Sequence, residues 1–121
     1  MDIFVKDNQG KDIEGIVWNQ NTTVFVDFTN PRGMTYWARQ IERFHSEVPF
    51  DALWVDMNEP YNFRNGTADN VCPDDNLERP PYVPGGDPLS THTLCMTAQH
   101  HLGSHYNVHS LYAHYETVAT N

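Results

Sequence analysis

The centre of this sequence is the stretch Leu53-Trp54-Val55-Asp56-Met57-Asn58-Glu59-Pro60. Ala52–Val55 is a run of four mostly apolar residues, which predicts a short strand buried on both faces, as in a parallel sheet. The predicted strand leads directly to the carboxylate of Asp56, and Pro60 cannot continue a strand ladder. Enzymes with parallel sheets carry their chemistry at the carboxyl ends of the strands. Position alone leaves two interpretations open: Asp56 or Glu59 is a catalytic acid, or it caps the following loop.

A strong helix pattern lies immediately before this strand. Asn30 is a good N-cap, and Pro31 suits the first helical turn, where its missing N–H costs nothing. Apolar residues then recur at spacings of three and four and form one stripe: Met34, Trp37, Ile41, Phe44 and Val48. Pro49 ends the pattern. Together with a short strand at Val24–Val26, the segment predicts a strand–helix–strand unit with parallel strands.

Two further regions follow the central stretch. Residues 58–99 are rich in proline and glycine and show little periodicity, which predicts a long functional or cross-linked loop. Residues 104–121 predict a second helix with a buried stripe made of Val108, Leu111, Tyr112, Tyr115, Val118 and Ala119. Residues 1–15 are polar and predict a frayed strand end and a turn at 8–10. The order of elements indicates an α/β fold.

Length and charge exclude several classes of protein. The chain has 121 residues, whereas a complete (β/α)8 barrel needs roughly 250, so we expect at most part of such a barrel. The net charge of −9, with seven Lys and Arg residues, argues against a nucleic-acid-binding protein. The sequence contains no apolar run long enough for a transmembrane helix, and its first residues lack the pattern of a signal peptide.

The cysteines and two short motifs bear on the cellular compartment. Cys72 and Cys95 are the only cysteines, and Asn21 and Asn65 each begin an N-glycosylation sequon. Sequons also arise by chance, and two cysteines can be free buried thiols. Taken together, these features favour the secretory pathway: a lysosomal, secreted or cell-surface protein.

The central stretch also carries a family resemblance. Residues 54–63 resemble the nucleophile signature of glycoside hydrolase family 31, the α-glucosidase family. The similarity continues through further motifs in the same order along the chain: Asp27-Phe28-Thr29-Asn30-Pro31, Phe44–Asp51, Pro80–Gly85 and His105–Tyr112.

The resemblance implies a fold and an activity. The fold is a partial (β/α)8 TIM barrel over residues 1–121, in the order strand, helix, nucleophile strand, long loop, helix. The implied activity is that of a retaining α-glucosidase, which removes terminal α-linked glucose from substrates of the maltose, starch or glycogen type without a cofactor. The resemblance places the acid/base carboxylate beyond residue 121, and it implies a disulfide between Cys72 and Cys95 that closes the loop at 58–99.

The resemblance also implies the roles of single residues. Asp56 is expected to be the nucleophile, which a rigid strand end would position well. Glu59 is expected to orient Asp56 or its neighbours through hydrogen bonds. Trp18, Trp54 and Met57 match positions that line the glucosyl subsite. From composition alone, a core position is the commoner role for a residue such as Trp18, and Met57 could be a gap filler.

Two other classes of function remain as alternatives. His101, His105 and His109 recur every four residues, and pairs with this spacing on a helix can bind zinc, although the sequence lacks a His-Glu-x-x-His motif. A non-catalytic carbohydrate-binding fragment would account for the aromatic residues but not for an acid that follows a buried strand. The expected partner is an oligosaccharide or polysaccharide, and we expect no bound metal.

Overall fold

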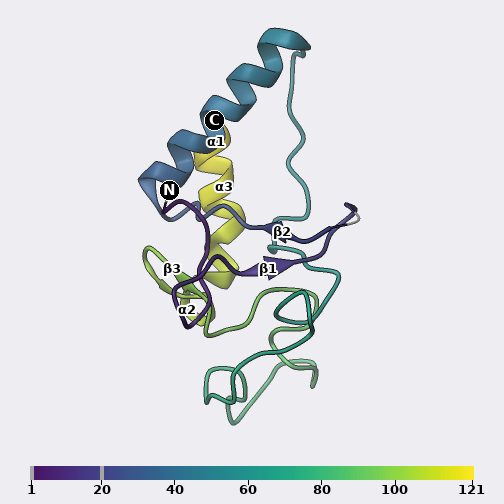
Figure 1. Ribbon diagram of the computed structural model, residues 1–121, viewed down its shortest axis with the longest axis vertical. Helices are drawn as coiled ribbons and strands as arrows, with labels where there is room; N and C mark the ends of the chain where they lie inside the picture. Colours follow the sequence, from purple (N-terminus) through teal and green to yellow (C-terminus); the bar gives the residue numbers. More distant parts are fainter. Residues whose placement is uncertain (1, 20) are drawn as a thin grey trace.

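A computed structural model describes residues 2–19 and 21–121. In chain order the elements are β1 (Glu14–Gly15), β2 (Thr23–Val24), α1 (Pro31–Glu47), β3 (Gln99–His100), β4 (Gly103–Ser104), α2 (His105–Val108), the 3-10 helix η1 (His109–Leu111) and α3 (Tyr112–Thr120). Figure 1 shows α1 and α3 side by side above the small strands, with the long loop at the opposite end.

The helix α1 forms where the sequence predicts it. The side-chain oxygen of Asn30 accepts a hydrogen bond from the N–H of Arg32 at 3.0 Å, and Pro31 occupies the first turn. The helix ends at Glu47, and the N–H of Val48 donates to the carbonyl of Phe44 at 2.8 Å. These interactions are local in sequence, so the helix depends little on distant residues for its boundaries.

The strands form two small antiparallel ribbons. β1 pairs with β2, and β3 pairs with β4. The N-terminal segment joins them, because the N–H of Val5 donates to the carbonyl of Phe25 at 2.9 Å and Lys6 exchanges backbone hydrogen bonds with Gln99. Its apolar side chains enter the core, whose members are Val5, Ile13, Phe25, Leu94, Cys95 and Ala98. The predicted strand at Val24–Val26 is therefore present in part, as the end of β2 and an antiparallel bridge from Val26 to Phe4.

The second predicted helix is present but interrupted. α2 and α3 are separated by η1, whose tighter turn changes the angular spacing of the side chains. As a result the buried face is formed by His105, Val108, Tyr112 and Glu116. The predicted stripe is wrong at two of its positions, since Leu111 is 46% exposed and Val118 is 53% exposed.

The prediction of a buried parallel strand at Ala52–Val55 is wrong for this chain. The segment is extended but unpaired, and it descends alone from the far end of α1 in Figure 1. Leu53 is 41% exposed and Trp54 is 85% exposed. A strand buried on both faces needs neighbouring strands at its edges and helices on its faces. The described residues supply α1 near one side and no strand at either edge.

The loop that follows is irregular, as predicted, and a disulfide crosses it. Cys72 and Cys95 are bonded, with their Cα atoms 5.5 Å apart, which confirms the predicted pairing. Gly66 lies against this disulfide with a positive φ of 79°, and a Cβ at this position would overlap the sulfur of Cys72. The loop is thus packed against its own cross-link and the core residue Leu94.

Candidate active site

Three of the predicted site residues line one open hollow. Trp18, Asp56 and Met57 border a space of about 330 Å³, which we call the Asp56 hollow. Its walls come from β2 and the following segment, from α1, from α3 and from the turn after Asp56. The remaining lining residues are Val17, Thr23, Val24, Phe25, Val26, Phe28, Trp37, Pro60, Tyr61, Tyr112 and Glu116.

Asp56 is the exposed end of a tight turn. The N–H of Met57 donates to its carboxylate at 2.8 Å, and the N–H of Tyr61 donates to the carbonyl of Met57 at 2.9 Å. Met57 has a positive φ of 58°, which is uncommon for a residue other than glycine. Pro60, at the other end of the turn, is fully buried. The buried end of the turn at Pro60, which we call its foot, is thus held in place, and the other end presents the Asp56 carboxylate to solvent.

Trp18 is not a core residue. Its side chain is 81% exposed, its indole N–H donates to the sulfur of Met57 at 3.0 Å, and its ring meets Phe63 edge-on with centroids 4.8 Å apart. Held in this way beside the Asp56 hollow, the indole leaves most of its surface free. Such a surface can pack against the C–H groups of a sugar.

Trp54 and Glu59 lie outside the Asp56 hollow. Trp54 borders a neighbouring groove of about 420 Å³ between α1 and the extended segment, and Asp56 borders this groove as well. Glu59 is exposed and lines a third hollow with Asn58, His109 and Ser110. Within the part of the chain that the structure describes, no hydrogen bond joins Glu59 to Asp56.

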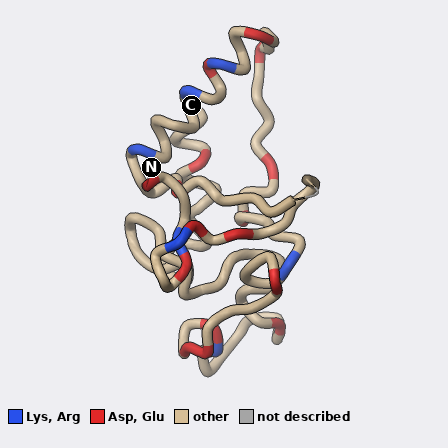
Figure 2. The backbone as a smooth tube through the Cα atoms, viewed as in Figure 1, with Lys and Arg blue, Asp and Glu red and all other residues tan. Residues whose placement is uncertain are grey.

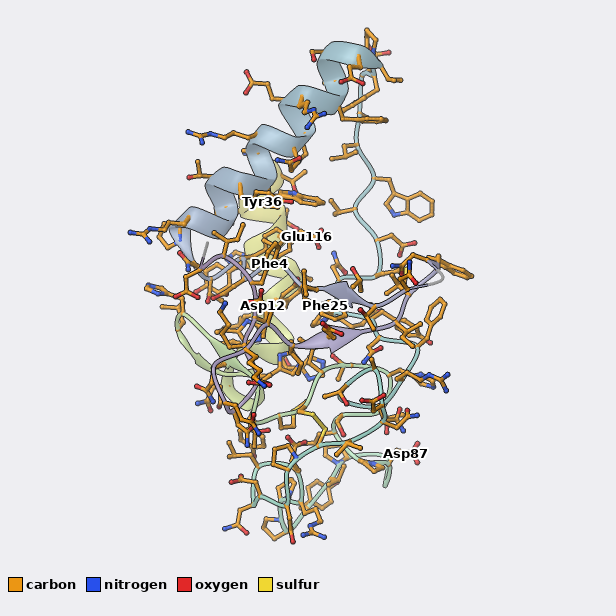
Figure 3. The ribbon with its side chains drawn as sticks, in the orientation of Figure 1. Phe4, Asp12, Phe25, Tyr36, Asp87 and Glu116 are labelled. Atoms are coloured by element: carbon orange, nitrogen blue, oxygen red, sulfur yellow. A yellow bond between two sulfur atoms is a disulfide. The ribbon has the colours of Figure 1, made fainter. Side chains whose placement is uncertain are left out.

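The sequence reasoning missed Glu116, which borders both spaces that Asp56 borders. Figure 3 shows this side chain projecting from α3 toward the side of the extended segment. It is 6% exposed, and its Oε2 atom has no hydrogen-bond partner among the described residues. Burial raises the pKa of the Glu116 carboxyl, and a hydrogen bond with Asn58 opposes this only in part. The sequence signal was a carboxylate four residues after Tyr112, inside an apolar stripe.

A second missed group is centred on Asp27, which is 3% exposed. Its carboxylate accepts hydrogen bonds from the N–H and hydroxyl of Thr29, at 3.0 and 2.7 Å, and from the N–H of His101 at 2.6 Å. His100 Nδ1 lies 3.4 Å from Asp27 Oδ1. Burial alone would raise the pKa of Asp27, but His100 and these donors outweigh it and lower the pKa. Asp27 is therefore held as a buried carboxylate.

The three histidines considered as zinc ligands do not share a helix face. His101 lies in the turn between β3 and β4, before the helix begins. Both ring nitrogens of His105 have partners, His100 at 3.0 Å and Thr93 at 3.3 Å. Burial, with His100 and His109 nearby, keeps the pKa of His105 well below the usual range. The geometry disfavours the zinc alternative, because His105 has no nitrogen left for a metal.

The remaining predicted residues lie on the surface. Asn21 and Asn65 are exposed, and the side-chain oxygen of Asn65 accepts a hydrogen bond from the N–H of His92 at 3.0 Å. Figure 2 shows Lys and Arg distributed over α1, the N-terminal ribbon and the loop, with no continuous basic patch in that view. Among the described residues, no helix combines the length and apolarity that crossing a membrane requires.

Comparisons with known proteins identify the family. The family model described as "Glycosyl hydrolases family 31 TIM-barrel domain" matches residues 1–121. The lysosomal alpha-glucosidase of Rattus norvegicus is 43% identical over 121 residues, and the match covers 98% of this chain and 12% of that protein. The intestinal sucrase-isomaltase of Homo sapiens is 37% identical, covering 98% of this chain and 6% of that protein.

Solved structures agree on the fold. The crystal structure of the glucosidase II alpha subunit, in its DNJ-bound form, aligns with a TM-score of 0.69 at 24% identity. The alignment covers 98% of this chain and 10% of that one, so the chain spans a small part of the relatives it matches. With a family match over its whole length, this chain belongs to glycosyl hydrolase family 31, and its fold is that of part of the family's TIM-barrel domain.

Proposed function

We propose that this chain supplies the nucleophile of a retaining α-glucosidase, and that Asp56 is that nucleophile. The observation that carries the proposal is the geometry of the Asp56 hollow. A solvent-facing carboxylate stands at its edge, on a turn whose foot is buried, with Trp18 and Met57 beside it. A retaining glycosidase needs such a carboxylate to attack the anomeric carbon and form a glycosyl-enzyme.

The neighbouring residues suit a sugar ring. The exposed indole of Trp18 offers an apolar face, and Met57 holds that indole through its sulfur. Trp54 extends the apolar surface along the adjoining groove and is proposed as a further substrate contact. Glu59 is proposed to act indirectly, because it lies beside His109 and not in the hollow. The acid/base carboxylate that completes the reaction is proposed to come from another part of the polypeptide.

The relatives support a proposed substrate class. Proteins named lysosomal alpha-glucosidase and intestinal sucrase-isomaltase match most of this chain. We therefore propose terminal α-linked glucose of maltose, starch or glycogen type as the substrate.

The Cys72–Cys95 disulfide supports a place in the secretory pathway, where we propose Asn21 and Asn65 as glycan acceptors.

The test is a pair of substitutions in the full-length polypeptide. Asp56→Asn keeps the shape of the side chain but removes the charge that attacks the sugar, so kcat should fall by at least about 10⁴-fold with the fold retained. Asp51→Asn is the matched control, because Asp51 is an exposed carboxylate on the same extended segment. Hydrolysis of maltose and of an aryl α-glucoside, with circular dichroism as the check on folding, gives the readout. Wild-type kcat in Asp56→Asn would exclude Asp56 as the nucleophile.

A further inference from the structure

A continuous chain of buried polar groups runs from Asp27 to the turn that carries Asp56. His100 Nε2 lies 3.0 Å from His105 Nδ1, and His105 Nε2 lies 3.3 Å from the hydroxyl of Thr93. That hydroxyl donates to the carbonyl of Pro60 at 2.7 Å. Thr93 is 2% exposed and His105 is fully buried. The proposed chemistry at Asp56 uses none of these groups directly.

The direction of each hydrogen bond is fixed by the last acceptor. A carbonyl oxygen can only accept, so Thr93 must donate to Pro60, and its oxygen is then free to accept from His105 Nε2–H. His105 with its proton on Nε2 accepts a hydrogen bond at Nδ1, and the donor of that bond is His100 Nε2–H. The pKa of His105, lowered mainly by burial, agrees with a neutral ring.

The other end of this chain of groups is anchored by charge. His100 Nδ1 faces Asp27 Oδ1 at 3.4 Å, a contact that is close enough for an ion pair but not aligned as a hydrogen bond. Asp27 already accepts from Thr29 and from the N–H of His101, which marks it as ionised. His100 thus lies with Nδ1 against this carboxylate and with Nε2 toward His105.

The Thr93 end of this chain of groups reaches Asp56 through a short path. Pro60 is the buried foot of the turn, and the Tyr61-to-Met57 backbone hydrogen bond closes that turn next to Asp56. The residue before Thr93 adds a second tie, since the N–H of Asn62 donates to the carbonyl of His92 at 2.9 Å. A loss of the Thr93 contact would leave a buried carbonyl without a partner and free the foot of the turn to move.

We propose that Thr93, oriented by His105, is a positioning residue that fixes the carbonyl of Pro60 and thereby the place of Asp56 in the hollow. The inference rests on the proposed function of Asp56. Displacement of a nucleophile by about 1 Å can cost about 10²-fold in rate, so a single buried hydrogen bond at the foot of the turn has a measurable effect on turnover.

The experiment uses three variants of the full-length polypeptide. Thr93→Val keeps the shape and removes the hydroxyl, Thr93→Ser keeps the hydroxyl and removes the methyl group, and Asp56→Asn reports on the proposed function. Active sites are counted by trapping with a 5-fluoro-α-glucosyl fluoride, so that kcat is expressed per competent site. A role in stability alone would lower the number of trapped sites and leave kcat per site unchanged.

Thr93→Val should lower kcat per site by about 10–100-fold with KM within about threefold of wild type, and Thr93→Ser should recover most of that loss. Wild-type kcat per site in Thr93→Val overturns the inference, while an inactive Asp56→Asn leaves the function standing. An active Asp56→Asn overturns the function itself.

Should Thr93→Val not accumulate, Thr93→Ala replaces it with the same expectation. If neither hydroxyl-free variant folds and Thr93→Ser does, the hydroxyl serves stability and the positioning role is overturned.

Discussion

At the scale of single residues, the site depends on polar groups whose surroundings differ sharply. Asp56 faces solvent, Asp27 is buried as a carboxylate, and Glu116 is buried with one oxygen that has no partner in residues 2–19 and 21–121. The same functional group is thus exposed in one place, stabilised as an anion in another, and disfavoured as an anion in the third. The proposed attack on a sugar is assigned to Asp56, the exposed carboxylate.

Glu116 leads to a prediction about pH and stability. Its folded pKa lies above the ordinary value of 4.5, so the folded protein binds more protons than the unfolded chain as pH rises past 4.5. Stability is therefore lost as pH increases through the folded pKa. Glu116→Gln removes this titration. The thermal midpoint of the variant should therefore rise relative to that of wild type as the pH increases from 4.5 to 7. Differential scanning calorimetry across this range measures the difference.

The control for this measurement is Glu42→Gln on the exposed side of α1. Its midpoint should follow wild type across the same pH range. A Glu116→Gln midpoint that runs parallel to wild type at every pH would show that the carboxyl is not held against ionisation in the folded protein.

At the residue scale, the pairing of Cys72 with Cys95 that the resemblance implied is confirmed by the disulfide. Asp56, Met57 and Trp18 line one hollow, and their roles there stay predictions. Prediction from sequence failed for the contacts of Asp27, whose partners His100 and His101 lie more than seventy positions further along the sequence. No local periodicity reports such a pairing, because it exists only once the ribbons have brought the two segments together.

At the scale of elements, α1 was predictable because its determinants are local. The N-cap, the proline at the first turn and the final proline all act within a few residues. The prediction of a strand at Ala52–Val55 was wrong, because a strand needs pairing partners that the described residues do not provide. The second helix lies between these cases: its extent was predicted, but η1 rotated its buried face.

The cap of α1 gives an element-scale prediction. Asn30→Ala removes the acceptor for the N–H of Arg32 and also the donor to the carbonyl of Asp2, and should lower the free energy of unfolding by about 1 kcal/mol. Asn30→Asp keeps the acceptor and should recover at least part of the loss. Urea unfolding followed by circular dichroism gives the values. Equal stability of wild type and Asn30→Ala would show that the helix start is held by packing alone.

At the scale of the whole molecule, the chain exposes a large apolar area along one side. Trp54 is 85% exposed, Phe44 is 55% exposed and Leu53 is 41% exposed, and all three border the groove between α1 and the extended segment. Figure 1 shows this segment separated from the body of the molecule along most of its length. Exposed apolar patches of this kind favour association.

Expressed alone, the 121-residue chain should therefore bind the dye ANS and self-associate at micromolar concentration. The double variant Phe44→Gln, Leu53→Gln should reduce both effects, because it removes apolar surface without touching the core. Light scattering and dye fluorescence provide the measurements. A monodisperse monomer without dye binding would contradict the expectation.

The central claim is that Asp56 attacks the sugar, and one measurement addresses it most directly. The full-length polypeptide is incubated with a 5-fluoro-α-glucosyl fluoride, which forms a glycosyl-enzyme but releases it slowly, and the labelled peptide is sequenced by mass spectrometry. The account predicts a single glycosyl adduct on the carboxylate of Asp56 and no adduct in Asp56→Asn. A label on Glu59, on Glu116 or on a residue outside this chain would contradict it.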